Sequence, residues 1–209
     1  MHSAYVTSSR GGDGLRHHYI DLVIESGLAA RGGDALDLGC GTGTLATMHL
    51  AEHFRVTGVD ISPPSIEVAR SEVPGADFVV GDMASVDFGD DSFDLVTAFY
   101  SLIHVPRDEH AVVLDRVASW LRPGGVLVVT MGAGGGDDTE EPDWLGVPMY
   151  WSNWDARTNV GLVEAAGFEV LRATTEHTIE DTRPVPFLWV VAQVPAKQSA
   201  TPPSSADPT

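Results

Sequence analysis

Short apolar segments alternate with longer amphipathic segments along most of this chain. The short segments are rich in β-branched residues, as strands are, and the longer ones repeat their apolar positions at helical spacing. The pattern predicts strands at 35–38, 56–60, 77–80, 95–98, 126–130, 168–175 and 187–194. It predicts helices at 15–28, from 43 or 44 to 54, and at 62–72, 107–121 and 159–166. Strands that alternate with helices indicate an α/β fold with a mostly parallel sheet and helices on both faces.

The size and composition of the chain fit one globular domain. The chain has 209 residues, of which 43% are hydrophobic, and this length is enough to bury a full core. No apolar run approaches the roughly 20 residues of a membrane span, and the first residues lack the apolar core of an export signal. Cys40 is the only cysteine, so no internal disulfide can form and we expect a cytoplasmic protein. The Pro-, Ser-, Thr- and Ala-rich segment 195–209 is predicted to be a disordered tail.

Acidic residues far outnumber basic ones in this sequence. The 30 Asp and Glu residues and 12 Lys and Arg residues give a formal net charge of −18, and the only lysine, Lys197, lies in the predicted tail. Nucleic acids and anionic membranes are bound through clustered Lys and Arg. We therefore expect neither as a partner, and a small neutral or cationic substrate fits this charge better.

The most informative motif is Asp-Leu-Gly-Cys-Gly-Thr-Gly at 37–43, which follows the first predicted strand. Glycines at alternate positions let the backbone turn sharply and approach a ligand with no Cβ in the way. The next predicted strand ends in an acid, Asp60. A glycine-rich turn followed by such an acid is typical of a doubly wound sheet that binds an adenine nucleoside, with the acid on the ribose hydroxyls.

This motif differs from the dinucleotide fingerprint Gly-x-Gly-x-x-Gly. The third glycine comes one residue early, and position 44 is Thr. Asp37 would also lie badly beside a pyrophosphate, whereas a carboxylate suits a ligand that carries an amine or a sulfonium. The spacing therefore disfavours a nicotinamide-dependent dehydrogenase.

Five segments resemble, in order, motifs of the class I S-adenosylmethionine-dependent methyltransferases. They are ALDLGCGTGT at 35–44, VDIS at 59–62, VGDM at 80–83, FDLVTAFYSLIHV at 93–105 and LRPGGVLVV at 121–129. The resemblance extends from 35 to 168, close to two thirds of the chain. It implies a Rossmann-like, doubly wound, seven-stranded sheet with an antiparallel C-terminal hairpin. It also implies S-adenosyl-L-methionine as the cofactor and S-adenosyl-L-homocysteine as the product.

The resemblance implies cofactor-binding roles for the residues of these motifs. Gly39 and Gly41 would admit the methionine moiety, and Asp37 would anchor its amino group. Asp60 would accept from both ribose hydroxyls, the alternative being a helix cap. The full set expected to bind the cofactor is Asp37, Gly39, Cys40, Gly41, Thr42, Asp60, Ile61, Gly81, Asp82, Met83, Phe99 and Tyr19.

Three further residues of this set are expected around the adenine. Ile61 and Met83 would pack on the ring, and Asp82 would accept from the adenine amine, unless it only forms a turn. Phe99 would line the pocket beyond the fourth strand. Tyr19 is included because many small-molecule members of the family cover the cofactor with an N-terminal Tyr-Asp-x-x-Ala-x-x-Tyr stretch. This chain has RGGDGLRHHY at 10–19 instead, and the lid role of the segment 1–31 is assigned to Tyr19.

A long insert at 131–157 separates the fifth predicted strand from the next helix. It holds a glycine-rich stretch, an acidic run and three of the five tryptophans. Long loops that leave the carboxyl ends of parallel strands are usually functional, and aromatic side chains suit the wall of an apolar pocket. We expect Trp144, Tyr150 or Trp151 to contact the substrate, unless they only cap the core. The acidic run could attract a cationic substrate, although such runs are more often solvated faces.

His104 and Tyr100 are the candidate catalytic residues. Methyl transfer to a hydroxyl needs alignment and a group that takes the proton. His104 follows the fourth strand, where the resemblance places the methyl group, and imidazole suits a base near neutral pH. It could instead only bond a backbone carbonyl. Tyr100 would contact the substrate or form the wall of the cofactor pocket. His17 and His18 could reach the site from the first helix, although a histidine pair on a helix lies more often on the surface.

The sequence therefore predicts a single domain over 1–194 that methylates an O or N atom of a small molecule, with oxygen slightly favoured. We expect a monomer or homodimer. No metal is expected, because the chain lacks the acidic trio with Asn of the Mg²⁺-dependent catechol methylases and has one cysteine. The alternatives are a non-catalytic cofactor-binding protein and an enzyme of the same fold that uses the cofactor for cyclopropanation or the decarboxylated cofactor for aminopropyl transfer.

Overall fold

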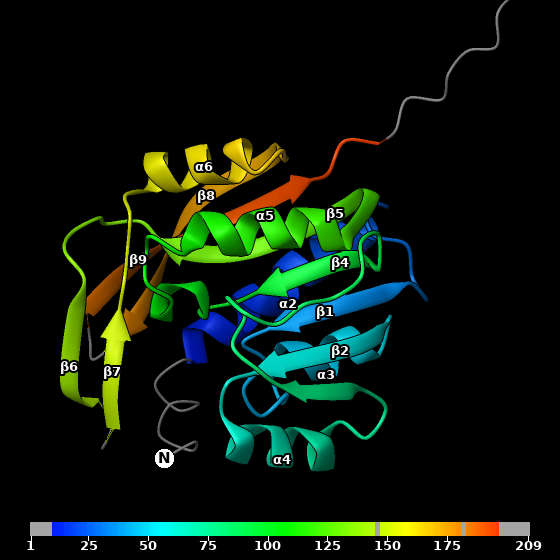
Figure 1. Cartoon of the computed structure of the whole chain (residues 1–209), viewed down its shortest axis with the longest axis horizontal. Coiled ribbons are helices and arrows are strands. Elements are labelled where there is room, and N and C mark those ends of the chain that lie inside the picture. Colours follow the sequence, from blue (N-terminus) through cyan, green and yellow to red (C-terminus); the bar gives the residue numbers. More distant parts are fainter. Residues whose placement is uncertain (1–9, 145–146, 181–182, 197–209) are drawn as a thin grey trace, which may run out of the picture.

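The fold is built on one seven-stranded sheet with the order β3-β2-β1-β4-β5-β9-β8. The computed structural model describes residues 10–144, 147–180 and 183–196 of the chain (Figure 1). The strands of the sheet are β1 (Asp34–Leu38), β2 (Arg55–Asp60), β3 (Asp77–Val80), β4 (Phe93–Ala98), β5 (Leu121–Gly132), β8 (Glu169–Glu180) and β9 (Arg183–Gln193). The first five pair in parallel, and β9 pairs antiparallel with both β5 and β8. The predicted fold class is confirmed.

Helices cover both faces of this sheet. They are α2 (Arg10–Glu25), α3 (Ala46–Ala51), α4 (Pro63–Glu72), the single-turn η1 (Leu102–His104), α5 (His110–Trp120) and α6 (Ala156–Ala165). Side chains of α5 and α6 share one core with the sheet, side chains of α2 and α3 share a second, and a smaller cluster joins α4 to β3. No helix in the described part of the chain is long and apolar enough to span a membrane.

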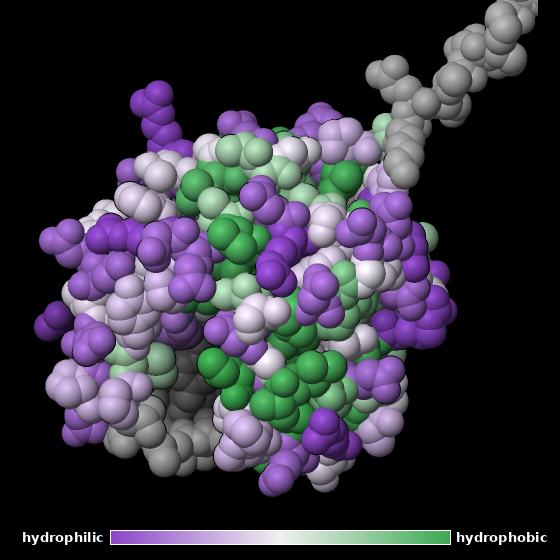
Figure 2. All heavy atoms as spheres, in the orientation of Figure 1, coloured by the Kyte–Doolittle hydropathy of each residue, from purple (hydrophilic) through white to green (hydrophobic). Residues whose placement is uncertain are grey.

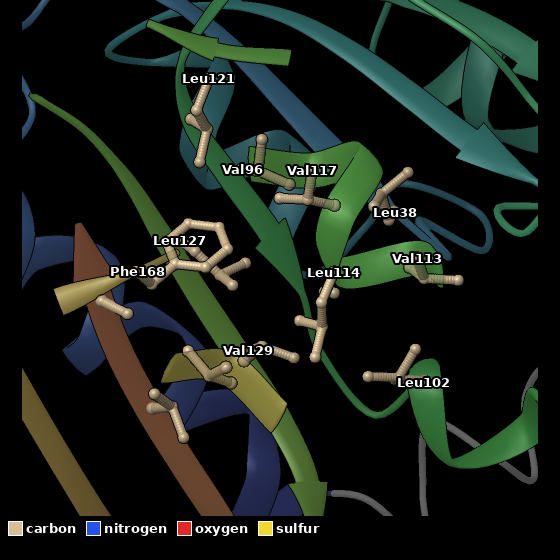
Figure 3. Packing of buried hydrophobic residues seen from close by; sticks show 14 of the residues in the cluster. Leu38, Val96, Leu102, Val113, Leu114, Val117, Leu121, Leu127, Val129 and Phe168 are labelled. Carbon is tan, nitrogen blue, oxygen red and sulfur yellow. The ribbon is translucent and has the colours of Figure 1, made fainter. Parts of the chain in front are cut away.

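Alternate residues of the central strands feed these two cores. Leu36 and Val96 face the α5 side, and Ala35 and Leu95 face the α2 side, as the period of two in a strand requires. Figure 3 shows Val113, Leu114 and Val117 of α5 in one cluster with Leu38, Val96 and Leu127 of the sheet. Burying one such Leu or Val side chain contributes about 1.5–3 kcal/mol. The continuous apolar character of the strands follows from burial on both faces.

Two helix starts depend on side-chain caps. Ser62 accepts a hydrogen bond of 3.3 Å from the backbone nitrogen of Ser65 at the start of α4. Asp155 accepts one of 2.9 Å from the backbone nitrogen of Thr158. Helix α6 therefore begins at Ala156, three residues before the predicted start, because a capping Asp satisfies a free N–H of the first turn.

The insert 131–157 is more ordered than the sequence indicated. Strand β5 continues to Gly132, and the strands β6 (Thr139–Trp144) and β7 (Val147–Trp151) form a separate antiparallel pair. The predicted long loop was wrong for this part of the insert. Its acidic strand β6 lacks the alternation of apolar and polar residues that marks a strand, so the sequence carried no local signal for it. The predicted tail lies, from residue 197 onward, outside the described residues.

Replacing Gly39 with Ala should destabilise the fold. Gly39 has a φ of +74°, and a Cβ there would lie 2.2 Å from the Cβ of Ser101. Left-handed backbone and overpacking each cost on the order of 1–2 kcal/mol, so we expect a clear drop in the urea midpoint of unfolding. Gly75→Ala is the matched control, because a Cβ at Gly75 meets nothing within 4 Å. Equal stability of the two variants would contradict the expected clash.

Candidate functional site

A cavity of about 620 Å³ lies at the carboxyl ends of β1, β2 and β4. Figure 2 shows the molecule hollowed there, between the β6–β7 pair and the central strands. The structure brings these predicted residues together on its wall: Asp37, Gly39, Cys40, Gly41, Thr42, Asp60, Ile61, Gly81, Asp82, Met83, Phe99, Tyr100 and His104. The described wall residues that the sequence analysis missed are Arg16, Thr44, Leu45, Ala46, Val59, Ser65, Ser101, Val105, Pro106, Glu109 and Met149.

The glycine turn after β1 presents bare backbone to this cavity. Gly41 has a φ of +56°, and a Cβ there would meet no protein atom within 4 Å. The backbone nitrogens of Gly39 and Cys40 both donate to the carbonyl of Val59, at 2.8 and 2.9 Å. These bonds fix the turn to the end of β2. Burial raises the pKa of the Cys40 thiol, so the thiol stays protonated and is a poor nucleophile.

Asp37 is a buried carboxylate at the end of β1, with 2% of its surface exposed. It accepts hydrogen bonds of 2.6 Å from the hydroxyl of Thr47 and 2.8 Å from that of Thr97. Burial raises the pKa of Asp37, while the two hydroxyls and the nearby charge of Arg16 act in the opposite direction. A buried carboxylate gains most from a positively charged neighbour, so this end of the cavity favours a cationic group.

Arg16 reaches the cavity from α2, which the sequence analysis did not anticipate. Its side chain is 4% exposed, and its guanidinium lies 4.6 Å from the centre of the Tyr100 ring. In the sequence Arg16 is an ordinary helical arginine one turn before the predicted lid residue Tyr19. What distinguishes it is its place on the cavity wall, with its charge near Asp37. A planar guanidinium is well suited to a carboxylate.

Asp60 ends β2 beside the glycine turn. Its Oδ2 accepts from the backbone nitrogen of Gly41 at 2.8 Å, and its Oδ1 accepts from that of Ser62 at 2.9 Å. Both bonds fix the direction of the carboxylate, and each oxygen keeps a further acceptor position. The next residue, Ile61, is 70% exposed although it is a large apolar side chain on the cavity wall. It therefore offers an apolar surface to a ligand.

The segment after β3 adds Gly81, Asp82 and Met83 to the same wall. Asp82 is exposed and accepts a hydrogen bond of 2.9 Å from the backbone nitrogen of Ala84. It thus forms a turn, as the alternative interpretation held, and it also faces the cavity. Met83 is half-buried and packs near Gly39, since its Cε lies 3.4 Å from where a Cβ at that glycine would be.

Phe99 and Tyr100 close the cavity beyond β4. Both side chains are buried. Tyr100 has a φ of +53°, an uncommon conformation for a bulky residue that often marks a functional site. Its hydroxyl lies 3.2 Å from that of Thr178, and its ring meets Phe187 edge-on at 4.8 Å. The ring rather than the hydroxyl is therefore what Tyr100 presents to the cavity.

His104 lies at the end of η1 and lines the cavity. Its Nδ1 donates a hydrogen bond of 2.9 Å to the carbonyl oxygen of Tyr150, and its ring lies 4.7 Å from that of Trp151. A histidine that donates through Nδ1 carries a free lone pair on Nε2. Burial lowers the pKa of His104, opposed by the bond to Tyr150 and the charge of Asp60. The site therefore holds a neutral imidazole.

The β6–β7 hairpin is anchored next to His104 by one acid of the acidic run, Asp138. Asp138 accepts hydrogen bonds from the Tyr150 hydroxyl at 2.7 Å and the Ser152 hydroxyl at 3.1 Å. It also pairs with the Nε of Arg107 at 3.0 Å. The remaining members of the run are exposed, as expected for a solvated face. Asp138 instead fixes the strand whose backbone carbonyl holds His104.

The predicted substrate contacts of the insert are not where the sequence placed them. Tyr150 and Trp151 are missing from the described residues of the cavity wall. The Tyr150 hydroxyl is directed to Asp138, and the Trp151 ring packs behind His104. The side chain of Trp144 lies outside the described residues. Met149 of β7 does reach the described wall, and strand alternation sends its direct neighbours Pro148 and Tyr150 to the other side.

Tyr19 also departs from its predicted place. It is fully buried and stacks on Trp189 with ring centres 4.5 Å apart. It therefore packs α2 onto β9 rather than covering the cavity. The helix does reach the site, but through Arg16, three residues earlier.

Comparisons with known proteins agree with this site. A model of the methyltransferase domain matches residues 35–125. A methyltransferase from Synechocystis sp. PCC 6803 is 30% identical over 183 residues, which cover 81% of each chain. A demethylmenaquinone methyltransferase from Renibacterium salmoninarum is 33% identical over 108 residues, covering 52% of this chain and 45% of that protein. The chain spans less than half the length of the first curated relatives that it matches.

Solved structures share the fold. An S-adenosylmethionine-dependent methyltransferase from Methanosarcina mazei aligns with a TM-score of 0.72 and 19% identity, over 82% of this chain and 97% of that one. The matched residues 35–125 contain the glycine turn, the acid at the end of β2 and the residues after β3 and β4, which form most of the cavity wall. The chain belongs to the class I S-adenosylmethionine-dependent methyltransferases.

Proposed function

We propose that this protein methylates an oxygen atom of a small hydroxylated molecule, with a nitrogen acceptor as the second possibility. The observation that carries the proposal is the state of His104. Its Nδ1 is committed to the carbonyl of Tyr150, and its pKa is lowered by burial. A neutral imidazole on the cavity wall is suited to take the proton that a hydroxyl loses on methylation, whereas an amine needs this help less.

The adenosine half of the cofactor fits the residues around Asp60. The carboxylate of Asp60 is already oriented by two backbone N–H groups, and we assign it to the two ribose hydroxyls. Ile61 offers the exposed apolar surface that a purine ring would cover. Met83 would pack on the ring, and Asp82 would accept from the adenine amine. Covering an exposed Ile favours the bound state because apolar area leaves water.

The methionine half fits the opposite end of the cavity. An amino acid carries one ammonium and one carboxylate, and the site offers Asp37 for the first and Arg16 for the second. Gly41 leaves the space that a Cβ would otherwise fill, so the ligand can approach the backbone. The donor set therefore matches a zwitterionic group joined to a nucleoside. S-adenosylmethionine, when bound, supplies a methyl group activated by the adjacent sulfonium.

The residues of the chain then have three tasks. The rings of Phe99 and Tyr100 exclude water from the reacting end of the cavity, and Met149 with Val105 gives the acceptor an apolar wall. His104 orients the acceptor hydroxyl at Nε2 and accepts its proton as the new bond forms. The apolar wall supports an aromatic or quinol-like acceptor, a class to which the name of the demethylmenaquinone methyltransferase relative also points.

The proposal is tested by a screen for methylated products. The full chain is incubated with S-adenosylmethionine and matched pairs of aromatic alcohols and amines, and products are identified by mass spectrometry. We expect methylation of one or more alcohols and weaker methylation of the paired amines. Methylation of amines alone would overturn the assignment of an oxygen acceptor. Tight binding of S-adenosylhomocysteine without turnover of any acceptor would favour a non-catalytic binding protein.

A further inference from the structure

Two histidines and an aspartate form a cluster on the outside of α2 and α3. Asp21, His49 and His53 each place one ligand atom within 4.8 Å of the others, and no other set of three in the described part of the chain does so. The Nε2 of His49 lies 2.8 Å from Oδ1 of Asp21. The rings of His49 and His53 are 5.5 Å apart. Local sequence patterns do not reveal this cluster, because Asp21 lies 28 residues before His49 in the chain.

We propose that these three side chains bind a divalent cation of the late first transition row, with zinc as the physiological candidate. His49 and His53 are four residues apart, so the helical spacing of α3 and the following turn brings them to one face. Imidazole nitrogen with one carboxylate oxygen is a donor set typical of such metals. A net charge of −18 also attracts cations to the surface.

The surroundings of the cluster decide what must move on binding. His49 is 17% exposed, and its Nδ1 lies 3.8 Å from Oε2 of Glu52. The Nδ1 of His53 is bonded by Arg31, whose side chain is exposed. A metal on His53 needs one ring nitrogen without a proton and the other free to carry it. Arg31 must therefore turn toward solvent, which an exposed side chain can do at low cost.

The position of the site gives the ion a structural effect. Helix α2 carries Arg16 into the cavity, and α3 begins at Ala46, which also lines it. A cation held by Asp21 of α2 and by the two histidines would tie these two cavity walls together. Any ligand that binds only the folded chain stabilises it. We therefore expect zinc to raise the midpoint of thermal unfolding.

The test is calorimetric titration of the metal-free full chain with zinc chloride. We expect one equivalent to bind in the wild type, and magnesium chloride to give no binding under the same conditions. His49→Gln and His53→Gln should each weaken zinc binding by at least about tenfold. Asp21→Asn should weaken zinc binding as well. Because Asn has nearly the same shape as Asp, this variant should fold normally, and a loss of binding would report the lost carboxylate. His18→Gln is the matched control, because His18 is an exposed histidine on α2, the helix that carries Asp21.

The thermal midpoint gives a second readout. Zinc should raise it in the wild type and in the His18 control, and should leave it unchanged in the three cluster variants. Failure of the wild type to bind zinc would overturn the proposal. So would equal affinity in the wild type and the cluster variants, because zinc would then be bound elsewhere on the chain.

Discussion

Replacing Asp60 with Ala is expected to weaken binding of S-adenosylhomocysteine by a hundredfold or more. The change removes an acceptor for two ribose hydroxyls, and hydrogen bonds to a charged group contribute about 1.5–3 kcal/mol each. It also frees the backbone nitrogens of Gly41 and Ser62, which the carboxylate now orders. Calorimetric titration of S-adenosylmethionine and S-adenosylhomocysteine into wild type and variant measures the loss, with NAD as a negative control.

Two further variants separate the ribose contact from a general loss of structure. Asp60→Asn keeps the shape of the side chain but loses the charge and one acceptor, so we expect an intermediate affinity. Asp115→Ala removes an exposed acid of α5 and should bind like the wild type. If Asp60→Ala bound both sulfur ligands with unchanged affinity, the adenosine assignment would be wrong. Tight binding of NAD by the wild type would point to a different cofactor.

The second large effect is expected for His104→Ala, which should lower kcat by about 10²–10⁴-fold. The loss should fall on the chemical step because His104 is assigned to the acceptor proton and not to the cofactor. Affinity for S-adenosylhomocysteine should therefore stay close to that of the wild type. Steady-state kinetics on the best acceptor, with titration of the product into the same variant, measure both quantities. An unchanged kcat would leave His104 with a structural role only.

The pH dependence gives an independent readout of the same assignment. Burial lowers the pKa of His104 below its ordinary value of 6.5. The imidazole is therefore neutral, and able to accept a proton, at all pH values above that lowered pKa. We expect kcat to be flat near neutral pH and to fall only in acid. This fall should lie below pH 6.5 and should be absent from His104→Ala.

Replacing Asp138 with Asn should lower kcat by roughly tenfold to a hundredfold, because a misplaced His104 aligns the acceptor less well. Asp138 is linked to His104 through Tyr150, from whose hydroxyl it accepts a hydrogen bond and whose carbonyl oxygen holds His104.

The parts of this molecule that repeat a local pattern were predictable from sequence. The strand pattern predicted the central sheet. The resemblance of five short motifs to the methyltransferase family supplied the predicted cofactor residues, and eleven of those twelve lie on the cavity wall. Each of these depends on residues close together in the chain. The positions of Asp37, Asp60 and Asp82 follow from strand ends, because the carboxyl ends of parallel strands meet at one edge of a sheet.

The contacts that could not be predicted from the sequence join residues that are far apart in the chain. Arg16 reaches the cavity only because α2 packs over β8 and β9 through Tyr19 and Trp189. Tyr19, which was predicted to cover the cofactor, instead stacks on Trp189. This packing places Arg16, one turn earlier in α2, on the cavity wall. The hairpin was missed because its register depends on Asp138 and Arg107, which no local periodicity reveals. Met149 reaches the cavity for the same reason.

The hydrogen bond that holds His104 ends on a main-chain oxygen and not on a side chain. Every amino acid at position 150 supplies such an oxygen, so mutation there cannot delete the acceptor. The tautomer of His104 is thereby insulated from substitutions in strand β7. Met149 and its neighbours could therefore be substituted without changing the tautomer of the His104 imidazole. If the proposed acceptor site is right, substitutions at Met149, which lines the cavity, should alter the choice of acceptor and leave the orientation of His104 intact.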